Sequence, residues 1–97
     1  MMAGKKITPS SGNVFLDMGF DPAVAEVMAM RAHLMIELEK TIRARGMTQV
    51  DAAKILKVSQ GRVSDIKRGK VEKFSLDSLV EMSARLGRHA RLVLSAA

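Results

Sequence analysis

The sequence predicts an all-α domain of four to five helices, and three observations support this fold class. Capping residues (Asp, Thr or Ser) stand before four segments of the chain. Within most of these segments apolar residues recur at three- and four-residue steps, which is typical of amphipathic helices. Only three aromatic residues, all Phe, accompany eight Met in the 97 residues. Small aliphatics and Met must therefore fill the core, which favours close-packed helices over a β-sandwich.

The first and longest predicted helix follows the dipeptide Asp21-Pro22 and closes at Gly46. Asp21 is the expected N-cap, and Pro22 occupies the first helical position, where no N–H is needed. Arg31 interrupts the apolar stripe, so we expect only about residues 31–45 to belong to the compact core. The stripe consists of Val24, Val27, Met28, Leu34, Met35, Leu38 and Ile42.

Residues 1–20 are predicted to form an N-terminal arm ahead of a domain at 21–87. Residues 1–12 carry Gly, Pro, Ser and Lys without periodicity, and we expect a mobile tail there. The stretch "NVFLDMGF" at 13–20 is a compact apolar patch with weak strand character.

The C-terminal stretch "RHARLVLSAA" (88–97) changes its apolar period to two, which predicts a short β-strand. A lone strand leaves a row of N–H and C=O groups unpaired. It would have to pair with its copy in a second chain, or with residues 13–18 of either chain. We therefore predict a homodimer, with Leu92, Val93 and Leu94 at the dimer contact.

Three shorter helices are predicted between the long helix and the strand. Thr48 caps 49–56, Ser59 caps 60–68, and Ser75 caps 76–86. The first two are joined by only three residues, 57–59, so they must cross steeply. Such a crossing needs a small residue at the contact, and the second helix must seat on the first through one face. The residues expected to pack there are Ala53, Ile55, Leu56, Val58, Val63 and Ile66.

Residues 48–68 thus match the helix-turn-helix pattern, with 60–68 as the recognition helix. The alternative is a helical hairpin that does not bind DNA. Three features together favour DNA binding: the two caps, the spacing from Ala53 to Val63 and Ile66, and the basic residues at the end of the second helix. Lys57 stands where such motifs usually have Gly, because the turn uses a left-handed conformation; that costs roughly 1 kcal/mol.

The outward residues of the predicted recognition helix suggest how it would read DNA. Gln60 suits an adenine edge, Arg62 a guanine or a phosphate, and Asp65 a cytosine amine. An ion pair of Asp65 with Arg62 or Arg68 is an equal alternative. Gly61 would allow close approach to the groove. The predicted DNA-binding residues are Thr48, Gln49, Ser59, Gln60, Gly61, Arg62, Ser64, Asp65, Lys67, Arg68 and Lys70.

Charge is unevenly divided along the chain, whose net charge is +6. Residues 1–39 have three basic and five acidic side chains (−2), and residues 40–97 have thirteen and five (+8). This favours a polyanion as partner for the second half and a different partner for the first. There is no Cys and no apolar run long enough for a signal peptide or membrane span, so we expect a cytoplasmic protein.

Two other classes of protein are alternatives to a DNA-binding regulator. An enzyme is disfavoured because His33 and His89 are far apart and no Cys or paired carboxylates accompany them at ligand spacing. We therefore expect no catalytic residues, no metal and no cofactor. A pure interaction module on the same scaffold would differ from a DNA binder in lacking steeply salt-dependent binding to duplex DNA.

The stretch "TQVDAAKILKVSQGRVSDIKRGK", followed by "FSLDSLVEM", resembles the Cro/lambda-repressor-like (XRE) helix-turn-helix proteins. The lead-in "SGNVFLDMGFDPAVAEVMAMRAHLMIEL" is similar, more narrowly, to the HigA-like branch. This resemblance implies a lambda-repressor-like fold and a dimeric repressor of its own operon. It also implies an antitoxin that neutralises a basic, mRNA-cleaving toxin of the HigB/RelE type. The alternative is a stand-alone XRE-family regulator with no toxin partner.

The arm and the first turn of the long helix are the expected site for such a toxin. Residues 13–30 are apolar and carry three acidic residues but no Lys or Arg, which would attract a basic protein and repel DNA. The alternative is that the segment only covers its own helices. The predicted partner-binding residues are Val14, Phe15, Leu16, Phe20 and Val24.

Overall fold

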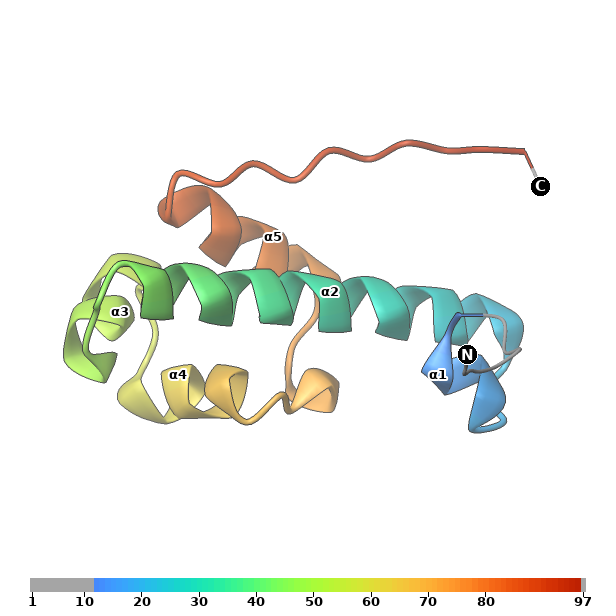
Figure 1. Ribbon diagram of the computed structural model, residues 1–97, viewed down its shortest axis with the longest axis horizontal. Helices are drawn as coiled ribbons and strands as arrows, with labels where there is room; N and C mark the ends of the chain where they lie inside the picture. The colour runs from blue at the N-terminus through green and yellow to red at the C-terminus, as the bar shows by residue number, and fades with distance from the viewer. Residues whose placement is uncertain (1–11, 97) are drawn as a thin grey trace.

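The computed structural model describes residues 12–96, and these form helices arranged around one long helix (Figure 1). Most of the predicted mobile tail, residues 1–11, and residue 97 lie outside the described residues. The elements are α1 (Val14–Asp17), α2 (Pro22–Ala44), α3 (Gln49–Leu56), α4 (Gln60–Lys67), a 3₁₀ helix η1 (Val71–Lys73) and α5 (Leu76–Arg85).

The long helix α2 begins as the sequence predicts. The Asp21 carboxylate accepts hydrogen bonds from the N–H groups of Ala23, at 3.0 Å, and Val24, at 3.4 Å. Pro22 occupies the first turn, where its missing N–H costs nothing. The helix ends at Ala44, and Gly46 follows with φ +63°, a left-handed conformation that suits glycine.

The core is built on the second half of α2, as predicted. Met35, Leu38 and Ile42 are buried there and pack with residues of α3, α4 and α5. In Figure 1, α5 lies on one side of α2, and α4 lies on the other. Further core residues are Ala52, Ala53, Leu56, Val63, Ile66, Phe74, Leu79, Met82 and Leu86. Ile55 does not fill the space between the helices, because it is exposed.

The apolar patch of the arm is helical, so its predicted strand character is wrong. The Asn13 side chain caps the helix by accepting from the N–H groups of Phe15, at 3.0 Å, and Leu16, at 3.3 Å. Such a local cap outweighs the weak β preference of Val and Phe. Its amide also donates to the carbonyl of Ala25 at 3.0 Å, which fastens α1 to α2.

The predicted C-terminal β-strand is not found. Residues 88–96 belong to no helix or strand among the residues that the structure describes. They form an extended segment that runs back along α2 (Figure 1). A strand needs a hydrogen-bonded neighbour, and this stretch lies beside helices, whose backbone groups are already paired. Leu92, Val93 and Leu94 are 76%, 83% and 88% exposed.

None of the helices within residues 12–96 combines the length and the apolar composition that crossing a membrane would require.

Candidate nucleic-acid interface

The helices α3 and α4 begin at the two predicted caps. The Thr48 hydroxyl accepts from the Asp51 N–H at 3.1 Å, and the Asp51 carboxylate accepts from the Thr48 N–H at 3.3 Å. This reciprocal pair is a capping box, closed here by Asp. The Ser59 hydroxyl accepts from the Arg62 N–H at 3.2 Å. The caps therefore fix where both helices start.

The connection between α3 and α4 turns at Lys57, which has φ 60° and ψ 45°. This is the left-handed conformation that the sequence predicts for this position, adopted by a residue that carries a Cβ. The Val58 N–H then donates to the Ala53 carbonyl at 3.0 Å, which closes the turn. Ala52 and Ala53 are both buried, so the two helices approach closely at small side chains.

The apolar residues of α4 are both buried, with Val63 0% and Ile66 2% exposed. This confirms the predicted seam. Gln60 and Gly61 are left exposed at the start of the helix, and Arg68 is exposed at its end. Ser64 and Asp65 are half-buried along the side of the helix. Both ends of α4 are thus presented to solvent, with uncharged Gln60 and Gly61 at the start and basic Lys67 and Arg68 at the end.

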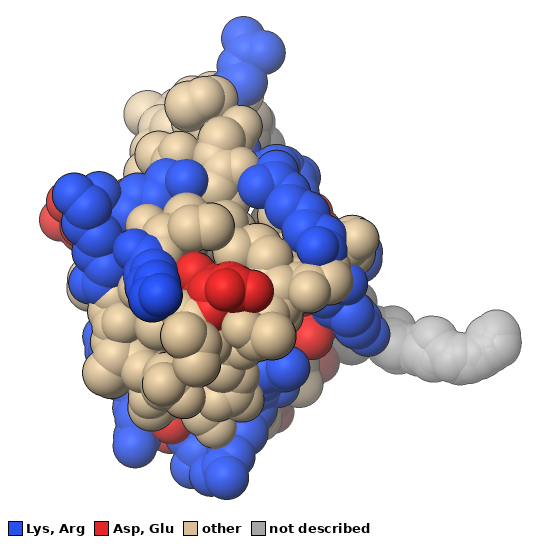
Figure 2. All heavy atoms as spheres, turned by 90° about the vertical axis from the view of Figure 1, so that its left-hand side faces the viewer, with Lys and Arg blue, Asp and Glu red and all other residues tan. Residues whose placement is uncertain are grey.

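The other predicted DNA-binding residues lie at the start of α3, between α3 and α4, and at or just after the end of α4. Thr48, Gln49, Ser59 and Lys67 are exposed, and Lys70 is half-buried. Figure 2 shows Lys and Arg side chains around the end of the molecule that lies at the left of Figure 1, with acidic atoms near the middle of the view. The basic charge therefore surrounds this end rather than forming one continuous patch.

Arg62 and Asp65 make contacts that the sequence analysis missed. The Arg62 guanidinium donates from Nη1 to the Lys73 carbonyl at 2.8 Å, and its Cζ lies 4.1 Å from the centre of the Phe74 ring. The partner of Asp65 is neither Arg62 nor Arg68; its carboxylate lies 4.0 Å from the Lys73 ammonium. These partners belong to or follow η1, an element too short and aperiodic to predict.

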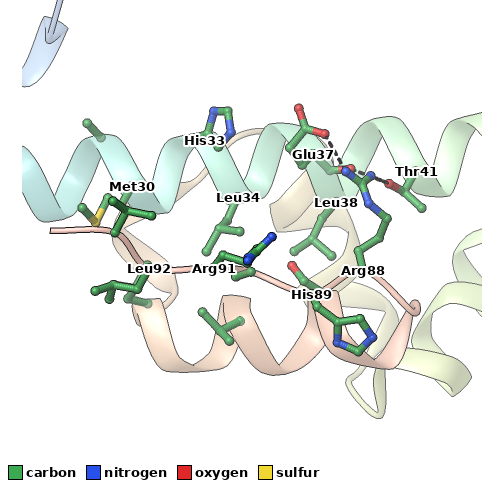
Figure 3. Close-up of a pocket in the computed structure, with 16 residues that line it drawn as sticks. Met30, His33, Leu34, Glu37, Leu38, Thr41, Arg88, His89, Arg91 and Leu92 are labelled. Atoms are coloured by element: carbon green, nitrogen blue, oxygen red, sulfur yellow. Dashed lines mark hydrogen bonds and ion pairs between the residues drawn. The ribbon is translucent and has the colours of Figure 1, made fainter. Parts of the chain in front are cut away.

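A groove of about 740 Å³ lies on another face of the molecule, between α2, α5 and the C-terminal segment (Figure 3). Arg88 sets the start of that segment: Nη1 donates to the Thr41 hydroxyl at 2.8 Å and Nη2 to the Glu37 carboxylate at 3.3 Å. Both His33 and His89 line the groove, yet they point in different directions. Within residues 12–96 no group of three or more His, Asp or Glu could hold a metal ion.

Comparison with known proteins gives one family match. A family model described as a helix-turn-helix domain matches residues 14–95, which is most of the chain. The curated proteins that were compared contain no match to this sequence. The family match includes every helix from α1 to α5 and most of the C-terminal segment, so it extends well beyond α3 and α4.

Proposed function

Because the chain belongs to the helix-turn-helix domain family, we propose that it is a sequence-specific transcriptional regulator that reads operator DNA with α4. One observation carries this proposal. Val63 and Ile66, the apolar residues of α4, are used up in packing, so the polar N-terminal end of the helix is exposed. Helix-turn-helix proteins place that end of the recognition helix against base edges in the major groove.

The two exposed residues at the start of α4 each have a role in this proposal. Gln60 hydrogen-bonds an adenine edge through its amide, and Gly61 lets the helix end come close to the groove floor. A Cβ at residue 61 would meet only the Ser59 hydroxyl, at 3.7 Å, so packing within the chain does not require glycine there. Arg68 lies at the far end of the same helix. Thr48, Gln49, Lys67 and Lys70 hold phosphates, helped by N–H groups at the helix starts.

The regulator acts as a homodimer in this proposal. Two copies related by a two-fold axis would present two α4 helices about 34 Å apart, one turn of DNA, and the operator would be pseudo-palindromic. Leu92, Val93 and Leu94 contribute to the contact between copies, because three adjacent apolar side chains are seldom left in water without a use. The resemblance to HigA-like proteins supports repression of the protein's own operon.

Selection from a random duplex library tests the proposal, followed by mobility shifts over a range of salt concentrations. We expect a selected sequence with two related half-sites. Its affinity should fall steeply with salt, since several phosphates are contacted. Two variants should weaken binding: Gln60→Ala, which loses a base contact, and Lys70→Ala, which loses a phosphate contact. Lys54→Ala, on the exposed side of α3, is the charge-matched control for Lys70→Ala. Failure to select any sequence would leave a protein-interaction module as the better explanation.

A second function, that of an antitoxin, is favoured by the surface of α1 and the start of α2. We call Val14, Phe15, Leu16, Phe20 and Val24 the N-terminal apolar surface. All but the half-buried Phe15 are exposed, with Val14 at 60%, although α1 is fastened to α2. The flanking charges are acidic (Asp17, Asp21 and Glu26), and residues 12–30 include no Lys or Arg.

A basic partner such as a HigB/RelE-type toxin would fit this surface, and the resemblance to HigA-like proteins supports that identity. Val14→Ser with Val24→Ser should abolish co-purification with the product of the neighbouring reading frame while operator binding persists. Val80→Ser, at an exposed apolar position on α5, is the matched control. If the double variant still captures the partner, or if no partner is captured by the unmodified protein, the chain is a stand-alone regulator.

A further inference from the structure

Arg62 lies in the first turn of α4, but its side chain reaches the segment that follows the helix. Nη1 donates to the Lys73 carbonyl at 2.8 Å, and the guanidinium carbon lies 4.1 Å from the ring centre of Phe74. Phe74 is buried and belongs to the hydrophobic core. The edge of the guanidinium is therefore used for a hydrogen bond and its face for a cation–π contact.

Asp65, three residues further along α4, joins the same two elements. Its carbonyl accepts from the Lys70 N–H at 3.0 Å, and its carboxylate lies 4.0 Å from the Lys73 ammonium. We call Arg62, Asp65, Lys73 and Phe74 the α4–η1 latch. Lys73 thus contacts two residues of α4, Arg62 through its carbonyl and Asp65 through its ammonium, so the first half of the helix is joined to the chain that follows it.

We infer that Arg62 is a positioning residue for DNA recognition and touches neither bases nor phosphates. This inference rests on the proposed function, and it departs from the expectation that Arg62 reaches a guanine or a phosphate. The latch fixes α4 against the core, which sets the direction in which Gln60 leaves the helix and the place of Lys70. To reach DNA, the guanidinium would have to leave both Phe74 and the Lys73 carbonyl, and the side-chain link between the first turn of α4 and the segment after the helix would be lost.

Because Arg62 acts through the latch, its substitution should change DNA binding differently from the substitution of a residue that reads bases. Arg62→Met keeps much of the aliphatic stem but removes the charge, the hydrogen bond and the cation–π contact. A looser α4 weakens every contact that the helix makes, whereas the choice of bases still depends on Gln60. The affinity should therefore fall while the preferred sequence stays the same.

The experiment uses the full chain and a random duplex library, selected in parallel by the unmodified protein, Arg62→Met, Arg62→Lys and Gln60→Ala. We expect Arg62→Met to select the same sequence as the unmodified protein and to bind it about tenfold more weakly. Gln60→Ala should change the preferred base at one position or more. Arg62→Lys should stay weak, because an ammonium lacks the planar face and fork that serve both partners at once.

Phe74→Leu tests the latch from its other side, with a buried residue that cannot touch DNA. It should reproduce the weaker affinity and unchanged preference of Arg62→Met. Affinities are measured well below the melting temperature and corrected for active fraction, so that a purely structural role would leave them unchanged. If Arg62→Met does not fold, Arg62→Lys supplies the same comparison.

Three outcomes would overturn the inference. An altered base preference in Arg62→Met would make Arg62 a base reader. Full affinity in Arg62→Lys would make it a phosphate ligand. Full affinity in both folded Arg62→Met and Phe74→Leu would leave the latch with a structural role alone. A failure of the unmodified protein to select any sequence is a separate result, because it contradicts the proposed function itself.

Discussion

The two halves of α2 have very different surroundings. Towards Ala44 the helix packs against α4, η1 and α5, and Leu38 and Ile42 are each 2% exposed. Towards Pro22 its main neighbour is the four-residue α1, and Val24, Val27 and Met30 are exposed. One continuous helix thus carries a packed end, which supports α4, and an open end, which presents apolar side chains to solvent. The difference separates the residues that hold the fold from those that are free to bind.

The largest difference between the two ends of α2 should appear in the free energy of unfolding of variants in which a large apolar side chain is replaced by Ala. Leu38→Ala should lower the free energy of unfolding by about 2–5 kcal/mol, because it empties a fully packed site. Val24→Ala, in the same helix, should change it by less than about 0.5 kcal/mol. Urea unfolding followed by circular dichroism measures both values. Comparable losses would mean that the open end is packed in solution, contrary to the comparison.

The C-terminal segment should matter for assembly and little for the fold. Leu92→Ser with Leu94→Ser should strongly weaken the homodimer that we propose, since burial of each such side chain contributes roughly 1.5–3 kcal/mol. Both side chains are exposed in the single chain, so the melting temperature of the monomer should stay the same. Light scattering over a dilution series reports the dimer. An undiminished dimer would place the contact between copies elsewhere.

Loss of the Gln60 side chain and loss of the Lys70 side chain, both near the packed end of α2, should change DNA binding in different ways. Gln60→Ala should reduce the preference for specific over non-specific DNA by about 1–3 kcal/mol, the value of a bidentate base contact. Lys70→Ala should weaken binding evenly across sequences and flatten the salt slope by about one unit. Competition mobility shifts measure both effects. Identical behaviour of the two variants would contradict the orientation proposed for α4.

Gly61→Ala should produce small changes, and in opposite directions for stability and binding. The helix should gain up to about 1 kcal/mol, since Ala is the better helix former and a Cβ there would meet only the Ser59 hydroxyl, at 3.7 Å. Affinity for operator DNA should fall, because the added methyl group stands between the helix end and the groove. Thermal unfolding and mobility shifts on the same sample test this. A variant that is more stable and binds equally well would remove Gly61 from the interface.

The features that the sequence predicts correctly depend on interactions between residues close together in the chain. The caps at Thr48, Ser59 and Ser75 act within three residues of themselves, so their spacing alone places three helices. The buried seam of α4 likewise follows from the three-residue step between Val63 and Ile66. These features explain why α3, α4 and α5 were predicted to within one residue at each end.

The errors arose where the outcome depends on residues distant in sequence. Alternation of apolar residues in 88–97 predicted a strand, but no neighbouring strand is available to pair with it within the described part of the chain. The partner of Arg62 is eleven residues away, in an element too short to show a period. The contact between Arg88 and Thr41 spans 47 residues. No local pattern encodes contacts of this kind.

The extended C-terminal segment also determines where the described chain ends emerge. It runs back along α2, so that residue 96 and the start of α1 both lie towards the end of the molecule opposite α3 (Figure 1). A fluorophore attached at residue 96 or at the start of α1 would therefore stand away from the exposed start of α4. The protein could be tethered to a sensor surface through its C-terminal side with α4 still accessible to duplex DNA, which makes direct measurement of association and dissociation rates practical.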